Sequence, residues 1–411
     1  MVSFCKFITC VLVTVAIYPA LFLVSVIIHY TQAVVPPGID QPLKLRLYNC
    51  VSISVFLLGI TLEKLRLYTL VGLLRLVTNG LPCCRDSSLL IQNQTFDKVP
   101  VRIYQLKEKT TQKRKALLYF HGGAGSLGSI DAFERMLRHI AKECDLVVVA
   151  VSYGLGPENP YPNQYAECLK AAVHFMKKAE DYQVEASRII IGGDSCGANF
   201  ATQICQLLGD RKDLPRVHAQ MLIYPGLQGM DFYLPSYQQN SKVAFLWRKL
   251  VIFFSCIYLN KKVSLVNDVL EGCHVPEAIR LKYQKWVNAD LIPEKFKVRG
   301  YKPQDPALRK FKPKVYEEMK QMLEVTFSPL FAEDAVICKL PHTCILTCEF
   351  DVLRDDGLLY KKRLEDNGVP VKWIHVENGI HGIVLFFGYG VLSFPSAGRI
   401  VNDLAEWVTC L

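Results

Sequence analysis

The pattern GDSCG at residues 193–197 is the first feature of this chain that could do chemistry, because it holds a serine in the spacing G-x-S-x-G. An apolar run at 188–191 precedes it, and a stretch with helical spacing at 198–208 follows it. In this context a tight turn between a strand and a helix exposes the serine hydroxyl, and the glycines remove side chains that would clash. The pattern therefore predicts Ser195 as a nucleophile, with the Cys196 amide at the helix start facing the developing oxyanion.

A second glycine-rich pattern, HGGAG, begins at His121 and follows a β-rich run at 116–120. In enzymes that attack carbonyl groups, a strand that leads into His-Gly-Gly supplies backbone amides to the oxyanion. Glycine allows these amides to approach the carbonyl closely. We therefore expect an oxyanion hole made of His121, Gly122, Gly123 and Cys196. An ordinary glycine turn is the structural alternative, and a phosphate-binding loop is disfavoured because no Gly-Lys-Ser/Thr follows.

Two residues after the serine could complete a catalytic triad, in the chain order acid and then histidine that this chemistry requires. Asp351 lies just past an apolar run at 344–347, where an orienting carboxylate belongs, and His381 lies in a loop after the run at 371–376. His375 falls inside that second run, so His381 is the histidine placed to act. The predicted reaction is acyl transfer to water, in which the histidine is the base and the aspartate fixes its tautomer. These steps need no metal ion and no organic cofactor.

Apolar β-rich runs alternate with stretches of helical spacing over most of the remaining chain. The expected strands are 116–120, 146–151, 188–191, 221–224, 344–347 and 371–376. Helical spacing at 131–143 and 164–178 separates some of them. This alternation predicts an α/β fold with a mostly parallel central sheet and helices on both faces. Residues 227–340 interrupt the alternation and are too long for a crossover, so we expect an inserted helical cap or lid there.

A transmembrane signal-anchor is expected at residues 7–28, which contain no charged side chain. About 20 apolar residues span the hydrocarbon core as a helix, whereas the apolar region of a cleaved signal peptide, the competing interpretation, has about 7–15 residues. Residues 1–6 would then form a short cytoplasmic tail. Residues 29–95 would form a luminal linker with N-terminal cap helices, which either cover the body or lie on the membrane. The catalytic domain would occupy residues 96–411.

Asn93 begins the triplet N-Q-T, which accepts an N-linked glycan only in the secretory lumen. Together with the anchor it favours a single-pass type II membrane protein whose body is luminal. The formal charge of the 411 residues is +10, it is dispersed along the chain, and no nucleic-acid motif accompanies it. The 15 cysteines form no C-x-x-C pair, so a zinc site is not expected. The expected partners are a hydrophobic ester or amide substrate and the lipid bilayer, with no obligate protein partner.

Six blocks of sequence carry a resemblance to a known family. They are HGGAGSLGS (121–129), SYGLGPENPYP (152–162), GDSCGANFA (193–201), IYPGLQGMDFYLPSYQQNS (223–241), DVLRDDG (351–357) and GIHG (379–382). Over essentially its whole length the chain resembles the hormone-sensitive-lipase-type branch of the α/β-hydrolases, the GDXG lipolytic enzymes, and within it the arylacetamide deacetylase family. The resemblance implies a microsomal, membrane-anchored hydrolase of carboxylic esters and arylamides, with its catalytic domain in the lumen of the endoplasmic reticulum.

The sequence departs from the family pattern at several positions. Ala124 replaces the third glycine of HGGG, and an alanine would distort that loop if the position needs a positive φ. Cys196 replaces the alanine of GDSAG, and Gly154 replaces a family arginine, which removes a structural charge. The resemblance implies a disulfide for Cys348, but Ser126 stands near the position of the expected partner. This pattern resembles a divergent paralogue of the founding enzyme.

The hypothesis that fits these observations is a serine hydrolase that cleaves carboxylic esters through an acyl-serine intermediate. Arylamides and lipid esters are substrates of the same chemistry, so the named residues do not separate them. The alternative is a catalytically silent hydrolase fold that binds a ligand, and an interaction protein that uses the fold as a scaffold is a third class. Proteins of the silent class usually lose a triad member, whereas this chain retains a serine, an acid and a histidine in the required order.

Overall fold

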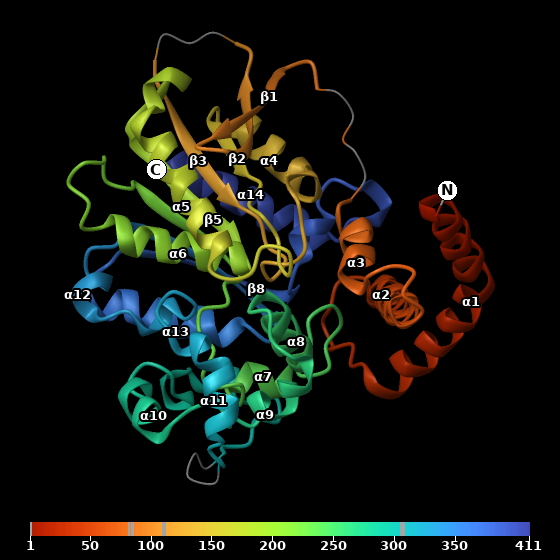
Figure 1. The fold of residues 1–411 in the computed structure, drawn as a ribbon. Helices are drawn as coiled ribbons and strands as arrows, with labels where there is room; N and C mark the ends of the chain where they lie inside the picture. Colours follow the sequence, from red (N-terminus) through yellow and green to blue (C-terminus); the bar gives the residue numbers. More distant parts are fainter. Residues whose placement is uncertain (1, 81–82, 84–85, 109–111, 305–308) are drawn as a thin grey trace.

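The computed structural model describes residues 2–80, 83, 86–108, 112–304 and 309–411. Its centre is an eight-stranded sheet in the order β1-β2-β4-β3-β5-β6-β7-β8 (Figure 1). The strands are β1 (Leu89–Phe96), β2 (Val99–Leu106), β3 (Arg114–Phe120), β4 (Val147–Val151), β5 (Val184–Asp194), β6 (Ala219–Ile223), β7 (His342–Phe350) and β8 (Val371–Ile380). Strands β3 to β8 run parallel, whereas β1 pairs antiparallel with β2 and β2 with β4. The predicted α/β fold with a mostly parallel sheet is confirmed.

The six expected strands are all present, but the hairpin of β1 and β2 is not among the predicted elements. Strand β1 has the sequence LLIQNQTF and is largely exposed between its two buried ends, so it contains no continuous apolar run of the kind that marks a strand buried on both faces. Because β1 pairs with β2 along its whole length, the hydrolase sheet begins inside residues 29–95. The expected boundary of the catalytic domain at residue 96 is therefore corrected to the start of β1.

Helices cover both faces of the sheet. One face carries α5 (Asn163–Lys177), α6 (Cys196–Leu208) and α13 (Arg354–Asp366), and the other carries α4 (Ile130–Glu143) and α14 (Pro395–Cys410). Along β3 the side chains alternate between these layers, because Leu118 and Phe120 pack on the first and Leu117 and Tyr119 on the second. Burial on both sides is the reason that β4 and residues 116–120 of β3 are apolar at every position.

The long insertion between β6 and β7 folds into short helices joined by turns. They are α7 (Pro235–Gln239), α8 (Arg248–Tyr258), α9 (Val266–Leu270), α10 (Glu277–Tyr283), α11 (Pro313–Met319) and α12 (Asp334–Ile337). Figure 1 shows α7 to α11 gathered at one end of the molecule, beyond the sheet. Within α8, Ile252 and Cys256 are fully buried, so this helix packs firmly on the hydrolase body.

Three helices precede the sheet on one flank of the molecule: α1 (Val2–Gln32), α2 (Pro42–Lys64) and α3 (Leu70–Thr78) (Figure 1). Both α1 and α2 are long and apolar enough to cross a membrane. Only 6% of the apolar part of α1 is buried, as expected of a membrane anchor, whereas half of the apolar part of α2 is buried in the protein. The two helices are tied together by His29, whose Nδ1 lies 2.7 Å from Nδ2 of Asn49. Helix α2 is therefore part of the folded body.

Candidate active site

The turn from β5 to α6 holds Ser195 in a strained backbone conformation, with φ 53° and ψ −121°. This conformation is sparsely populated by residues other than glycine, and such strain is typical of functional turns. The flanking glycines are required by space, since a Cβ on Gly193 would lie 2.5 Å from the Phe120 carbonyl oxygen and a Cβ on Gly197 only 2.0 Å from it. The turn therefore directs the serine hydroxyl outward at the carboxyl end of the parallel sheet, as the G-x-S-x-G pattern predicts.

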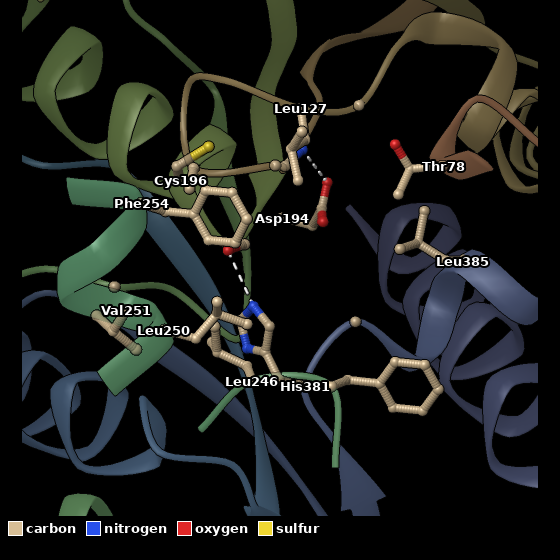
Figure 2. Close-up of a pocket in the computed structure, with 18 of the residues that line it drawn as sticks. Thr78, Leu127, Asp194, Cys196, Leu246, Leu250, Val251, Phe254, His381 and Leu385 are labelled. Carbon is tan, nitrogen blue, oxygen red and sulfur yellow. Dashed lines mark hydrogen bonds between the residues drawn. The ribbon is translucent and has the colours of Figure 1, made fainter. Parts of the chain in front are cut away.

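The two predicted partners of the serine lie within hydrogen-bond reach of one another. Nε2 of His381 is 3.0 Å from Oγ of Ser195, a hydrogen bond drawn as the dashed line at His381 in Figure 2. Nδ1 of His381 is 2.8 Å from Oδ2 of Asp351. Asp351 is fully buried after β7, and its Oδ1 accepts a hydrogen bond of 2.8 Å from the Leu353 amide. With Nδ1–H donating its hydrogen bond to the Asp351 carboxylate, Nε2 is free to accept the serine proton, which is the arrangement that acyl transfer needs.

The predicted oxyanion hole is corrected at two of its four residues. The Gly122 amide donates a 2.7 Å hydrogen bond to Oδ1 of Asp194, so it is not available to an oxyanion. His121 is buried behind the loop, where the Tyr153 hydroxyl donates to its carbonyl oxygen at 2.6 Å. Burial lowers the pKa of His121 to about 4, which keeps its ring neutral. His121 does not line the cavity, and Gly122 lines it with its amide already paired.

The remaining two residues of the predicted hole are Gly123 and Cys196. Within the described part of the chain, no hydrogen-bond acceptor takes the amides of Gly123 and Cys196, and both residues line the cavity that contains Ser195. Cys196 is the first residue of α6, where helix amides have no intrahelical acceptor and the helix dipole favours negative charge. These two amides are therefore free to donate hydrogen bonds to an oxyanion in the cavity.

Asp194 is a functional residue that the motif analysis misses, although it is the variable position of G-x-S-x-G directly before the serine. Its buried carboxylate accepts from the Tyr119 hydroxyl at 2.8 Å as well as from the Gly122 amide. Burial raises the pKa of Asp194 to about 6, and these hydrogen bonds together with nearby His381 moderate the shift. Asp194 thus fastens the loop that follows β3 to the turn that carries the nucleophile.

In the loop after β3, Ala124 replaces the third glycine of the family's HGGG pattern, and it adopts a positive φ of 53°. The neighbouring departure, Cys196, lies against this loop, because its Sγ accepts a hydrogen bond from the Gly125 amide at 3.2 Å. Arg75 of α3 holds the loop from the other side, where its Nε donates to the Ser126 carbonyl oxygen at 2.8 Å. The N-terminal helices therefore help to position the residues beside the nucleophile.

The serine opens into a cavity of about 670 Å³ with a largely apolar lining. Its apolar side chains come from the cap, from the N-terminal helices and from the segment after β8: Leu246, Leu250, Val251, Phe254, Val51, Leu76, Val77 and Leu385. Figure 2 shows the cap residues on one side of His381, with Thr78 and Leu385 on the other. No lysine or arginine occurs among the described residues that line it. The cavity is suited to an uncharged, apolar substrate.

Two further predicted positions lie away from the cavity. Asn93 is exposed on β1, and its Oδ1 accepts a 2.8 Å hydrogen bond from Nε of Arg102. Cys348 is a buried free thiol in β7, and Ser126, near the position of the family's partner cysteine, is also buried. Burial raises the pKa of the Cys348 thiol well above its ordinary value, which makes it an inert core residue.

Comparisons with known proteins place this geometry in a family. A family model for the alpha/beta hydrolase fold matches residues 117–272 and 294–385. The chain is 38% identical to human arylacetamide deacetylase-like 4 over 94% of its own length and 95% of that protein's. It is 34% identical to bovine arylacetamide deacetylase over 92% of its length and 95% of that protein's. Among solved structures, an esterase from Pyrobaculum calidifontis superposes with a TM-score of 0.63 at 21% identity, covering 91% of this chain and 99% of that one.

The fold and the site thus define an α/β-hydrolase of the esterase and deacetylase type. Within that family, the chain belongs to the group of arylacetamide deacetylase and its relatives, which it matches at 32–39% identity over most of its length.

Proposed function

We propose that this protein is a membrane-anchored serine hydrolase that cleaves carboxylic esters of apolar acids or alcohols. The observation that carries the proposal is the position of His381, within 3.0 Å of the Ser195 hydroxyl and 2.8 Å of the Asp351 carboxylate. This geometry supports a sequence of proton transfers that needs no group beyond the chain and water.

In the first half of the reaction, Oγ of Ser195 attacks the ester carbonyl while Nε2 of His381 accepts the hydroxyl proton. The amides of Gly123 and Cys196 stabilise the resulting oxyanion, and one such donor typically contributes about 3–4 kcal/mol to the transition state. His381 then returns the proton to the leaving alcohol, and an acyl-serine remains. In the second half, His381 activates a water molecule that releases the acid. Asp351 stabilises the charged imidazole in both halves.

The largely apolar cavity supports hydrophobic esters as substrates, and a lining with carboxyl groups but no lysine or arginine among its described residues disfavours substrates that carry a free phosphate or carboxylate. Relatives named arylacetamide deacetylase support arylamides as a second substrate class, since the same acyl-serine chemistry cleaves both bonds. Helix α1 supports a membrane anchor. We infer a type II orientation, with the body in the lumen of the endoplasmic reticulum, from this anchor together with the glycan-acceptor triplet at Asn93. In this setting the enzyme would contribute to the turnover of lipid or xenobiotic esters.

The test is active-site labelling of the full chain with a fluorophosphonate, followed by hydrolysis of p-nitrophenyl esters, neutral glycerides and arylacetamides. We expect labelling and turnover in the natural protein and in a Ser187→Ala control, because Ser187 is exposed far from the cavity. Both should disappear in Ser195→Ala. Binding of apolar esters without labelling or turnover would instead identify the silent, ligand-binding alternative.

A further inference from the structure

Exposed apolar side chains surround the mouth of the active-site cavity. We define this rim as Leu43 and Leu47 of α2, Leu76 and Val77 of α3, and Val391 and Leu392 of the turn before α14. Their exposed fractions range from 47% at Leu392 to 88% at Val391. Single exposed apolar residues are ordinary on protein surfaces, but a contiguous group marks a contact with another apolar phase.

Hydrogen bonds bring two of the three segments of the rim together. Nζ of Lys44 donates to the Val391 carbonyl oxygen at 2.7 Å, and the Tyr48 hydroxyl donates to the Leu392 carbonyl oxygen at 2.9 Å. The first turns of α2 are thereby fixed beside the turn before α14, although more than 340 residues separate them in the sequence.

The third segment meets the others across the cavity. Gly80, just after α3, approaches Tyr389 so closely that a Cβ at this glycine would lie 2.5 Å from the Tyr389 hydroxyl. Leu76, Val77 and Leu392 line the same cavity as Ser195 and His381. Because these three side chains are exposed and also line the cavity, the cavity reaches the surface through the rim.

The membrane anchor ends next to the rim. His29 directly follows the apolar stretch 7–28, and its Nε2 lies 3.2 Å from Nη1 of Arg46, one residue from Leu47 on α2. Figure 1 shows α1, α2 and α3 together on one flank of the molecule. An α1 helix inserted in a bilayer therefore brings the rim to the membrane surface, where burial of its leucines and valines is favourable.

We propose that the rim is a second membrane contact, separate from α1, through which apolar esters pass from the bilayer to Ser195 without crossing water. The bilayer is the occupant that the structure favours, because a protein partner or a second copy seated on the rim would close the cavity mouth. This inference rests on the proposed function for the passage of substrate, but the membrane contact itself can be measured without any activity.

The direct test places a tryptophan at the rim and measures its quenching by lipid. The full chain with Val391→Trp is reconstituted in phosphatidylcholine vesicles with and without brominated acyl chains. Leu281→Trp is the matched control, because Leu281 is 55% exposed on α10, on the flank opposite α1 (Figure 1). The four natural tryptophans are common to both variants. We expect brominated lipid to remove at least half of the fluorescence added at position 391 and little of that added at 281. Equal quenching at the two positions would overturn the proposal.

A second measurement follows the passage of substrate. Leu43→Asp combined with Val391→Asp changes two rim residues that do not line the cavity, and Leu281→Asp serves as control. We expect at least a tenfold loss of kcat/KM toward a long-chain ester dissolved in the vesicles, with less than twofold change toward water-soluble p-nitrophenyl acetate. An equal loss on both esters would show structural damage and contradict the passage through the rim. If the natural protein hydrolyses no ester, the proposed function fails, and the quenching result still decides the membrane contact.

Discussion

Replacement of Asp194 by asparagine should make the stability of the protein less dependent on pH. The carboxyl has an ordinary pKa of 3.8, and burial raises it to about 6 in the folded protein. The folded state therefore binds this proton more tightly than the unfolded chain does. Stability from this residue is fully present below pH 4 and is lost as the pH rises to about 6. One pKa unit corresponds to about 1.4 kcal/mol, so the shift corresponds to roughly 3 kcal/mol of unfolding free energy.

In Asp194→Asn the side chain is neutral at every pH, while its Oδ1 can still accept from the Tyr119 hydroxyl and the Gly122 amide. Urea unfolding of the full chain in detergent, followed by tryptophan fluorescence between pH 4 and 7.5, provides the assay. As the pH rises from 4 to 7.5, we expect the unfolding free energy of the variant to increase by up to about 3 kcal/mol relative to that of the natural protein. Parallel stability curves for the two proteins would refute the assignment of a raised pKa to Asp194.

Two substitutions of Asp194 distinguish the effect of its charge from its effect on the position of the loop after β3. Asp194→Ala removes the acceptor of the Gly122 amide, which leaves a buried donor unpaired at a cost of about 1–3 kcal/mol and frees the oxyanion loop. We expect kcat to fall by about 10²–10³, as it does when an oxyanion donor is lost, whereas Asp194→Asn should stay within about tenfold. Equal kcat values for the two variants would show that the hydrogen bond to Gly122 does not hold the loop.

Three further predictions concern the loop after β3 and the edge strand β1. Gly123→Ala should lower kcat at least a hundredfold without loss of helical circular dichroism, because the new Cβ would lie 2.1 Å from the Leu127 carbonyl oxygen. Ala124→Gly should raise the unfolding temperature slightly. The positive φ destabilises the folded state of the alanine protein by about 1–2 kcal/mol, and the greater freedom of glycine in the unfolded chain cancels about 0.5–1 kcal/mol of that gain. A lower unfolding temperature for the variant would contradict the backbone strain at this position. Asn93→Gln should abolish a gel shift caused by a glycosidase that removes N-linked glycans, and a natural protein with no such shift would argue against a luminal body.

The nucleophile and its partners could be predicted from the sequence because the residues next to each of them in the chain form a recognisable pattern. Ser195 lies between glycines that the turn requires for space, and Asp351 and His381 follow the β-rich runs at 344–347 and 371–376. Parallel strands bring their carboxyl ends to one edge of the sheet, so residues far apart in sequence meet there once the strands are recognised. The half-exposed strand β1 gave no such signal, because its polar residues face water.

The tertiary structure alone decided which amides serve the oxyanion and what surrounds the substrate. Gly122 and Gly123 are adjacent and chemically identical, and only the position of the Asp194 carboxylate separates an amide that is paired inside the protein from one that is open to a substrate. The cavity and its apolar rim combine α2, α3, the cap and the turn before α14. Hydrogen-bond direction and exposure depend on partners that are distant in the chain, and a local pattern cannot specify them. The sequence by itself determined the chemistry, and packing decided its access to substrate.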